Sequence, residues 1–226
     1  FFSSHPNLYH VGNGYKGANN TYADDGVEWV AETVIRYRKE YMYNAEETRE
    51  AFVDHFEAAE KDPNIKLMGF SSEFFAFTIG QEVDSAIKAK RLHDIFGDNT
   101  KIIFIFREQF SLLRSLYLEM VRGGYYKTFR KFMDYTYLFQ DRNWCHDFCY
   151  DKVYETYAKL FGEKNMVPIP FELLMSIFDK VIILVENQRM DLTFEGNIRT
   201  ALGACIDGDN AGLADSYAQA GARAAA

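Results

Sequence analysis

The stretch Lys101-Ile-Ile-Phe-Ile-Phe-Arg107 decides the fold of this chain, and Ser115 follows eight residues after its arginine. A continuous run of β-branched and aromatic residues is typical of a central strand in a parallel sheet, where both faces are buried. The segment from about residue 110 to 122 has a helical pattern and carries Ser115. In open α/β sheets ligands bind beyond the carboxyl ends of the strands, where Arg107 lies. Its guanidinium and the Ser115 hydroxyl therefore predict a site for an anion such as a phosphate.

Segments with strand and helix patterns alternate on both sides of this stretch. Besides 101–106, we expect strands at 7–11, 65–70 and 165–169. We expect helices at about 24–41, 44–61, 83–96, 110–122, 126–138, 144–161 and 171–185. Such alternation predicts an α/β fold with a central parallel sheet flanked by helices. The 226 residues suit a single domain over 1–217, followed by an Ala/Gly-rich tail of undetermined origin at 218–226.

The composition excludes several classes of protein. A net charge of −8 argues against a nucleic-acid binder, which would carry a basic surface. The chain has no apolar run of about 18 residues, so we expect no membrane span in it. Three cysteines are too few for a disulfide framework and indicate a reducing compartment, which favours the cytoplasm. Cys145 and Cys149 lie close to His146, but a metal site needs more ligands, so we expect buried thiols and no metal.

A markedly aromatic segment follows the predicted phosphate-binding helix. Twenty Phe and fifteen Tyr make the whole chain rich in rings. In this segment they recur at helical spacing, at Tyr125, Tyr126, Phe129, Phe132, Tyr135 and Tyr137. Such spacing is typical of side chains packed in a hydrophobic core. Alternatively, some of these rings line a cleft that stacks on a sugar or a nucleobase.

Three segments together resemble the sulfotransferases that use 3′-phosphoadenosine 5′-phosphosulfate (PAPS). In chain order they are Phe1–Pro6, Arg107–Tyr117 and Tyr150–Leu174. The first is similar to the end of the family's first helix, and the second to its 3′-phosphate motif. The third, with regularly spaced tyrosines followed by LFGEKNMVPIPFELL, is similar to a late strand and the helix after it. The resemblance spans about residues 1–175.

The resemblance implies a three-layer P-loop-NTPase-like fold and an enzyme that moves a sulfuryl group from PAPS to a hydroxyl or amine. The acceptor would be a saccharide, a lipid or a small molecule, with no metal required. Arg107 and Ser115 would bind the 3′-phosphate of the co-substrate. In the family, a K-x-G-T-T loop before the first helix grips the 5′-phosphosulfate through backbone N–H groups. This loop would lie upstream of Phe1, so we expect the chain to be N-terminally incomplete.

Two positions of the 3′-phosphate motif depart from the family's pattern. Gln109 replaces the proline that usually stands two residues after the arginine, and Leu112 replaces a second arginine. Neither change removes Arg107 or Ser115, the two groups that the resemblance places on the phosphate.

The base that takes the acceptor's proton has two candidates, Glu73 and His10. Family members use a His or a Glu, or a Lys-Ser pair on the strand before the 3′-phosphate motif. Here Ser71 aligns with the serine of that pair, and Glu73 is the nearest carboxylate. His10 lies on the earlier strand, close to where the acceptor is expected. Alternatively, Glu73 is an acid at the start of a helix and His10 an ordinary polar residue at a strand end.

Three functions stay open at this stage: a PAPS-dependent sulfotransferase, a catalytically inactive relative that binds a nucleotide or a partner, and a P-loop nucleotide kinase-like phosphotransferase. The basic residues Arg122, Lys127, Arg130 and Lys131 form either a groove for an anionic polymer or a solvated helix face. A Golgi-luminal catalytic domain trimmed of its anchor is the alternative to a cytoplasmic protein. The acceptor and the oligomeric state cannot be deduced from the sequence.

Overall fold

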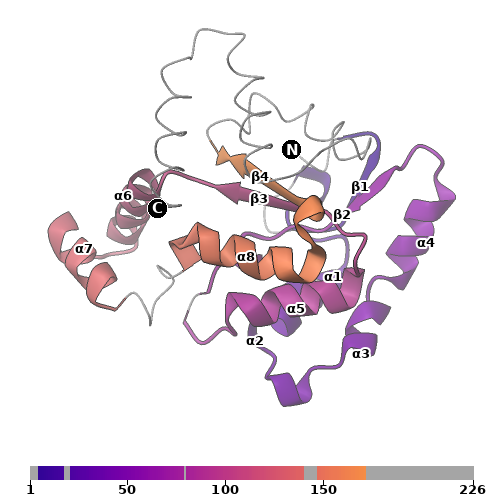
Figure 1. Ribbon diagram of the computed structural model, residues 1–226, viewed down its shortest axis with the longest axis horizontal. Helices are drawn as coiled ribbons and strands as arrows, with labels where there is room; N and C mark the ends of the chain where they lie inside the picture. Colours follow the sequence, from indigo (N-terminus) through magenta and orange to yellow (C-terminus); the bar gives the residue numbers. More distant parts are fainter. Residues whose placement is uncertain (1–4, 18–20, 79, 140–146, 172–226) are drawn as a thin grey trace, which may run out of the picture.

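The described part of the chain forms a mixed α/β structure around two pairs of parallel strands (Figure 1). This computed structural model describes residues 5–17, 21–78, 80–139 and 147–171. Strand β1 (Leu8–His10) pairs with β2 (Leu67–Gly69), and β3 (Ile102–Phe106) pairs with β4 (Met166–Pro170). All four predicted strands are therefore present, and both pairings are parallel as predicted.

The helices lie between these strands, in the predicted order. Asn44 caps the second predicted helix by accepting from the backbone N–H groups of Glu46 and Glu47, and Gly97 ends a later helix with φ 73°. Both ends agree with the sequence prediction. The α-helices are α1 (Asp25–Trp29), α2 (Ile35–Tyr37), α3 (Ala45–Glu50), α4 (Val53–Lys61), α5 (Ser85–Phe96), α6 (Gln109–Arg122), α7 (Phe129–Leu138) and α8 (Tyr150–Phe161). A π-helical turn, η3 (Val30–Val34), joins α1 to α2, and single 3-10 turns occur at η2 (Tyr15–Gly17), η4 (Glu40–Met42), η5 (Glu73–Phe75) and η7 (Glu163–Asn165).

The predicted helix over 24–41 is wrong at its carboxyl end, because α2 ends at Tyr37. The cause lies on α5, where the side chain of Arg91 is completely buried. Its guanidinium donates to the carbonyl oxygens of Val34 (2.7 Å) and Arg38 (2.5 Å). Carbonyl groups at a helix end need partners outside the helix, and Arg91 supplies them here.

The predicted helix over 44–61 is two helices, α3 and α4, separated at Ala51 and Phe52. Phe52 is completely buried, and its ring centroid lies 5.1 Å from those of both Phe70 and Phe96. The helical path breaks where this side chain enters the aromatic core, a long-range contact that helical periodicity does not reveal.

Two later helices begin after their predicted positions. Helix α7 begins at Phe129, where Thr128 caps it by accepting from the backbone N–H of Lys131 (3.3 Å). Helix α8 begins at Tyr150. Residues 144–146, the predicted helix beyond residue 171, and the tail at 218–226 lie outside the described residues. Within the described part, no helix is both long enough and apolar enough to cross a bilayer.

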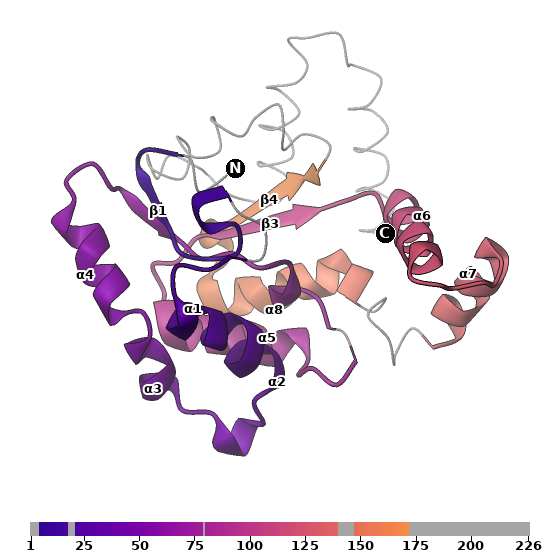
Figure 2. The same cartoon turned by 180° about the vertical axis from the view of Figure 1, so that it is seen from behind.

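Helix α8 covers one face of the β3–β4 pair, and α5 lies against α8 on the side away from the strands (Figure 1). Seen from behind, α2 lies against α5, and α3 and α4 stand at one end of the molecule (Figure 2). Both views place the α6–α7 pair at the opposite end, beyond the carboxyl end of β3. Helices α8 and α5 are thus layered on one side of the described β3–β4 pair.

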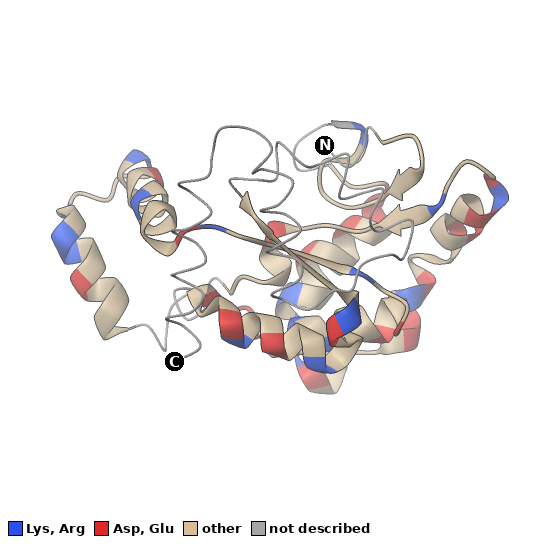
Figure 3. Ribbon diagram, turned by 45° about the horizontal axis from the view of Figure 1, so that its top comes forward, with Lys and Arg blue, Asp and Glu red and all other residues tan. Residues whose placement is uncertain are grey.

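Strand β3 is less enclosed than the sequence predicts. Among the described residues it pairs with β4 alone, and Ile105 is 39% exposed. Ile102, Phe104 and Phe106 belong to the hydrophobic core, because alternate side chains of a strand point to the same face. The prediction that both faces of β3 are buried is therefore not met within the described part. Figure 3 shows that charged residues flank this strand at its two ends and are frequent on the helices.

The aromatic segment after residue 124 was predicted to be core, and most of it is not. Phe132 is buried, but Tyr126, Tyr135 and Tyr137 are 82%, 58% and 74% exposed. The segment forms α7 and the connection that leads to it, at the end of the molecule away from the central core (Figure 1). The prediction of buried thiols is also wrong for Cys149, which is exposed in front of α8.

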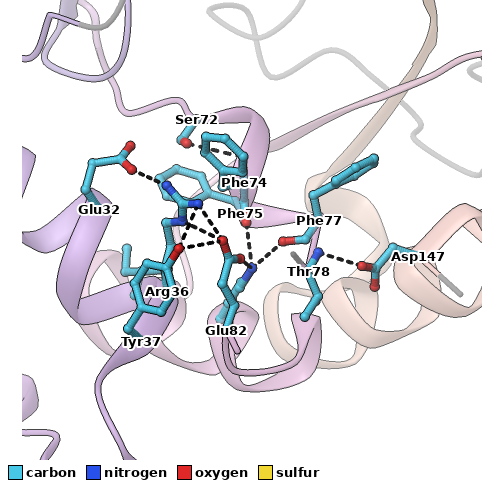
Figure 4. Close-up of polar contacts among 12 residues, drawn as sticks. Glu32, Arg36, Tyr37, Ser72, Phe74, Phe75, Phe77, Thr78, Glu82 and Asp147 are labelled. Atoms are coloured by element: carbon cyan, nitrogen blue, oxygen red, sulfur yellow. Dashed lines mark hydrogen bonds and ion pairs between the residues drawn. The ribbon is translucent and has the colours of Figure 1, made fainter. Parts of the chain in front are cut away.

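A buried ion-pair network joins α2, α5 and the segment between them (Figure 4). The side chain of Glu82, just before α5, is fully buried and accepts from Arg36 of α2 and Lys88 of α5, each at 2.5 Å. Arg36 also pairs with Glu32, and its guanidinium lies 3.7 Å from the ring centroid of Phe74. Burial lowers the pKa of Lys88, although its ion pair with Glu82 acts in the opposite direction. The network thereby fixes two helices against one loop.

The loop that follows β2 is held by side chains from the helices and from the segment before α8. These contacts involve backbone groups of the loop, so they fix its path rather than one side chain (Figure 4). The bonds are Lys88 Nζ to the carbonyl oxygens of Phe74 (3.0 Å) and Phe77, Tyr157 Oη to the carbonyl oxygen of Phe75 (2.9 Å), and the Thr78 N–H to Asp147 Oδ2 (2.7 Å).

Replacing Glu82 with Gln is expected to lower the free energy of unfolding by about 3–5 kcal/mol, because Arg36 and Lys88 lose their shared buried carboxylate. The matched control is Glu57→Gln, which breaks the exposed Lys61–Glu57 pair and should cost less than about 1 kcal/mol. Urea denaturation measures both values. Equal losses in the two variants would contradict the central role given to Glu82.

Candidate functional site

His10 and Ser71 meet at the carboxyl ends of β1 and β2. His10 is the last residue of β1, Ser71 follows β2 by two residues, and His10 Nε2 lies 2.8 Å from Ser71 Oγ. Backbone bonds continue the parallel pairing beyond the strands, from the N–H of Val11 to Gly69 (2.9 Å) and from that of Asn13 to Ser71 (2.9 Å). The structure therefore joins the predicted histidine to the serine that the sequence aligned with the family's Lys-Ser pair.

The imidazole of His10 is neutral at pH 7. His10 is only 6% exposed, and burial lowers its pKa from 6.5 to about 4. In a neutral imidazole one ring nitrogen accepts a hydrogen bond and the other donates one. His10 can therefore accept the proton of a hydroxyl, but its lowered pKa makes it a weak base.

Tyr22 links Asn13 and Ser72, which lie next to this pair along the chain, to Glu32. Its hydroxyl donates to Glu32 Oε1 (2.5 Å) and also forms hydrogen bonds with the side chains of Ser72 and Asn13. Burial raises the pKa of Tyr22, and the bond to Glu32 raises it further, so the hydroxyl stays protonated. Because Glu32 also pairs with Arg36, the polar groups near His10 are continuous with the buried ion-pair network.

Gly12 allows the chain after β1 to approach Ser71. A Cβ atom at residue 12 would overlap the backbone nitrogen of Ser71 and lie 2.5 Å from its carbonyl oxygen. Only glycine fits such a contact between two backbone segments without a shift of one of them. A glycine placed directly after a strand is a recognisable sequence signal, but the backbone that it approaches is seen only in the fold.

Glu73, the other candidate base, is exposed and lies at the first residue of η5. Ser72 caps this turn by accepting from the backbone N–H of Phe74 (3.2 Å). Glu73 therefore occupies the position of an acid at the start of a helical turn, which was the alternative interpretation of this residue. It belongs to the same loop as Ser71 and shares its anchoring.

Arg107 directly follows β3, where the sequence placed it. Its guanidinium lies 5.3 Å from the ring centroid of Phe171, the residue after β4. The neighbouring carboxylate of Glu108 instead caps α6, accepting from the N–H groups of Phe110 (2.9 Å) and Ser111 (2.6 Å). Hydrogen bonds from Ser111 and Phe110 lower the pKa of Glu108, so it stays ionised at that cap. Within the described part, no carboxylate forms a salt bridge with Arg107.

Ser115 lies half-buried on α6, beyond the first turn that Glu108 caps. Tyr117, two residues later, donates to the carbonyl oxygen of Lys127 (3.1 Å) and so stabilises the connection to α7. The described strand, cap and helix agree with the predicted local order of the motif. Whether Arg107 and Ser115 bind a common anion stays a prediction.

Phe148 links the loop after β2 to the start of α6. Its ring centroid lies 5.3 Å from that of Phe77, and its carbonyl oxygen accepts from Gln109 Nε2 (2.6 Å). Gln109, which replaces the family's proline, thus has a structural partner. The loop that carries Ser71 and Glu73 is thereby tied to the first residue of the helix that carries Ser115.

The sequence did not reveal the polar groups that link the Ser71 segment to the buried ion-pair network, namely Asn13, Tyr22 and Glu32. Each is an ordinary polar residue in its local pattern, and only the fold brings the three together. Among the described residues, no group of three or more His, Cys, Asp or Glu side chains is placed to hold a metal ion. The expectation that no metal is needed stays a prediction.

Comparison with known proteins supports the fold more than any detail of the site. No protein-family model matches the chain, and no curated protein matches it. Its fold is similar to the crystal structure of a sulfotransferase from Alicyclobacillus acidocaldarius, with a TM-score of 0.51 and 15% sequence identity. The match covers 87% of this chain and 80% of that one. The described chain is therefore a mixed α/β structure with a sulfotransferase-like fold.

The pKa of His10 predicts how stability depends on pH. Between pH 6.5 and about 4 the unfolded chain binds a proton at His10 that the folded chain does not, so stability falls as the pH falls. This contribution reaches at most about 3 kcal/mol. Urea denaturation across this range should show the wild-type advantage over His10→Gln shrinking with acidification. A constant difference between the two proteins would contradict a buried, neutral His10.

Gly12→Ala is expected to lower the free energy of unfolding by roughly 1–3 kcal/mol, because the added methyl group overlaps the backbone at Ser71. The control is Gly123→Ala, whose added Cβ makes an ordinary contact at 3.4 Å and should change stability by less than about 1 kcal/mol. Thermal and urea unfolding measure both. An equal change in the free energy of unfolding for the two variants would show that the chain at residue 12 can move away from Ser71 without loss of stability.

Proposed function

We propose that this protein is a PAPS-dependent sulfotransferase that acts on a hydroxyl or amine of a saccharide, lipid or small-molecule acceptor. The observation that carries the proposal is Arg107 at the end of β3. Its cation has no salt bridge within the described part, because Glu108 is engaged at the cap of α6. The sulfotransferase-like fold gives this local arrangement its functional context.

In the proposed complex, Arg107 and Ser115 hold the 3′-phosphate of PAPS. A guanidinium offers two parallel N–H donors to phosphate oxygens, and a hydroxyl can add a third. These bonds set the position of the nucleotide without touching the sulfur. The three-layer P-loop-NTPase-like arrangement belongs to the same proposal.

PAPS supplies the activated sulfuryl group: the acceptor oxygen or nitrogen forms the new bond to sulfur, and adenosine 3′,5′-bisphosphate leaves. The acceptor proton must then pass to a base of this chain. His10 is one candidate, acting through the Ser71 hydroxyl that its Nε2 contacts, and exposed Glu73 on the same loop is the other. The buried ion-pair network and Gly12 fix the loop on which both candidates depend.

A catalytically inactive nucleotide-binding relative is the second candidate function. The observation that favours it is the burial of His10, whose pKa of about 4 makes it a weak base. One measurement distinguishes the two functions. An active enzyme and an inactive relative would both bind adenosine 3′,5′-bisphosphate, but only the enzyme would transfer a sulfuryl group from PAPS to an acceptor.

Arg107→Ala is expected to weaken binding of adenosine 3′,5′-bisphosphate by roughly 30- to 100-fold, as the loss of a charged hydrogen-bonding group implies. Ser115→Ala should weaken it about fivefold, the value of one neutral hydrogen bond. Arg114→Ala, on the exposed side of α6, is the matched control and should leave binding unchanged. Calorimetric titration of the intact protein measures all three.

The same titration with AMP tests the assignment to the 3′-phosphate. AMP lacks that group, so Arg107→Ala should leave AMP binding unchanged. A folded Arg107→Ala variant that binds the bisphosphate as tightly as the parent would remove Arg107 from the site.

A further inference from the structure

Helices α6 and α7 with their connection form a hairpin that stands apart from the core (Figures 1 and 2). Its two helices are joined by their own aromatic contacts. Tyr117 packs its ring 5.1 Å from that of Phe129 and 5.6 Å from that of Phe132, and Phe110 lies 6.0 Å from Phe129. These rings therefore pack against one another on the inner side of the hairpin. They do not explain the apolar side chains that are exposed on its outer side.

Exposed apolar side chains are concentrated on this hairpin. Of the fifteen large hydrophobic residues that are exposed in the described part, nine lie between residues 110 and 139. Tyr126, in the connection between the helices, is 82% exposed, and Tyr137 on α7 is 74% exposed. An open hollow on α7 is lined by apolar and charged side chains, namely Lys131, Met133, Asp134, Tyr137 and Leu138. So many apolar groups in one region indicate an interaction surface rather than chance exposure.

The hairpin is also basic in an acidic protein. Residues 109–139 contain five Lys and Arg but two Asp and Glu, whereas the whole chain has 25 and 33. Figure 3 shows basic positions on both helices. Lys127 lies 4.1 Å from the ring centroid of Tyr126, so a cation and an exposed ring occupy the same point of the connection. The five basic residues are Arg114, Arg122, Lys127, Arg130 and Lys131.

The combination of exposed apolar side chains and basic side chains distinguishes between possible partners. A second copy of this chain, in a twofold dimer, would place the same basic surface against itself. Protein interfaces are in general depleted of lysine. An anionic polymer explains the cations but not the exposed aliphatic side chains of Leu118 and Val121. An anionic lipid surface accommodates both, because aromatic rings favour the headgroup region and basic side chains are attracted to anionic lipids.

We propose that the α6–α7 hairpin docks the protein on an anionic lipid surface, with Tyr126 at the interface and the basic side chains against the headgroups. This inference does not depend on the proposed enzymatic function. The protein would then be a peripheral membrane-binding protein, and the carboxyl end of β3 would lie next to the lipid surface.

The test is co-sedimentation of the intact protein with vesicles of phosphatidylcholine alone or with about three parts in ten phosphatidylglycerol. Binding is expected with the anionic vesicles, little with the neutral ones, and a marked decrease at about 1 M salt, where the screening length is about 3 Å. No binding to either vesicle, or equal binding to both at all salt concentrations, would overturn the proposal.

Variants locate the surface. Lys127→Gln combined with Arg130→Gln should weaken binding to anionic vesicles at least about tenfold, and Tyr126→Ser roughly fivefold. The matched control combines Lys39→Gln with Tyr41→Ser, because Tyr41 is 87% exposed and lies in η4, away from the hairpin. Circular dichroism checks that each variant is folded.

The control should bind as the parent does. The assignment of the lipid-binding surface to the hairpin would be overturned by hairpin variants that bind anionic vesicles like the parent. It would also be overturned by a control variant that loses as much binding as they do. Analytical ultracentrifugation without lipid covers the remaining alternative: a dimer that Tyr126→Ser dissociates would show that a second copy covers this surface, and the proposal would be wrong.

Discussion

The loop that carries Ser71 and Glu73 depends on one buried carboxylate. Glu82 has no exposed side-chain surface and holds Arg36 of α2 and Lys88 of α5 at the same time. Lys88 then reaches back to the loop backbone at Phe74 and Phe77. Buried ion pairs are weak evidence for stability but can select one arrangement over others, because a misplaced partner leaves an unpaired charge. In this protein, the selected arrangement is the path of the chain from Ser71 to Thr78.

With that path fixed, two strand ends present different chemistry. The β1–β2 end offers a neutral imidazole, hydroxyls and Glu73, which are groups that can receive or orient a proton. The β3 end offers the guanidinium of Arg107 and a helix whose N-terminus is already capped by Glu108. A sulfuryl transferase needs both kinds of chemistry, and Phe148 ties the two regions together through Phe77 and Gln109. This separation of the two kinds of group suits a co-substrate held at the β3 end and an acceptor held at the β1–β2 end.

The sequence was sufficient wherever the deciding signal is local. The β-branched run of β3, the Asn44 cap and the Gly97 stop each act within a few residues, and the structure has them. Helix ends set by distant side chains, such as Arg91 at α2, could not be predicted. The same holds for the buried ion-pair network, since charged residues are usually exposed and only the fold shows which are paired inside. Helical spacing identified the aromatic face of the α6–α7 hairpin but not whether anything in the core covers it.

The most direct measurement is the structure of the intact protein crystallised with adenosine 3′,5′-bisphosphate. The 3′-phosphate is expected within hydrogen-bond distance of the Arg107 guanidinium and the Ser115 hydroxyl, beyond the carboxyl end of β3. A nucleotide bound elsewhere, or a 3′-phosphate that faces solvent while Arg107 stays on the ring of Phe171, would contradict it.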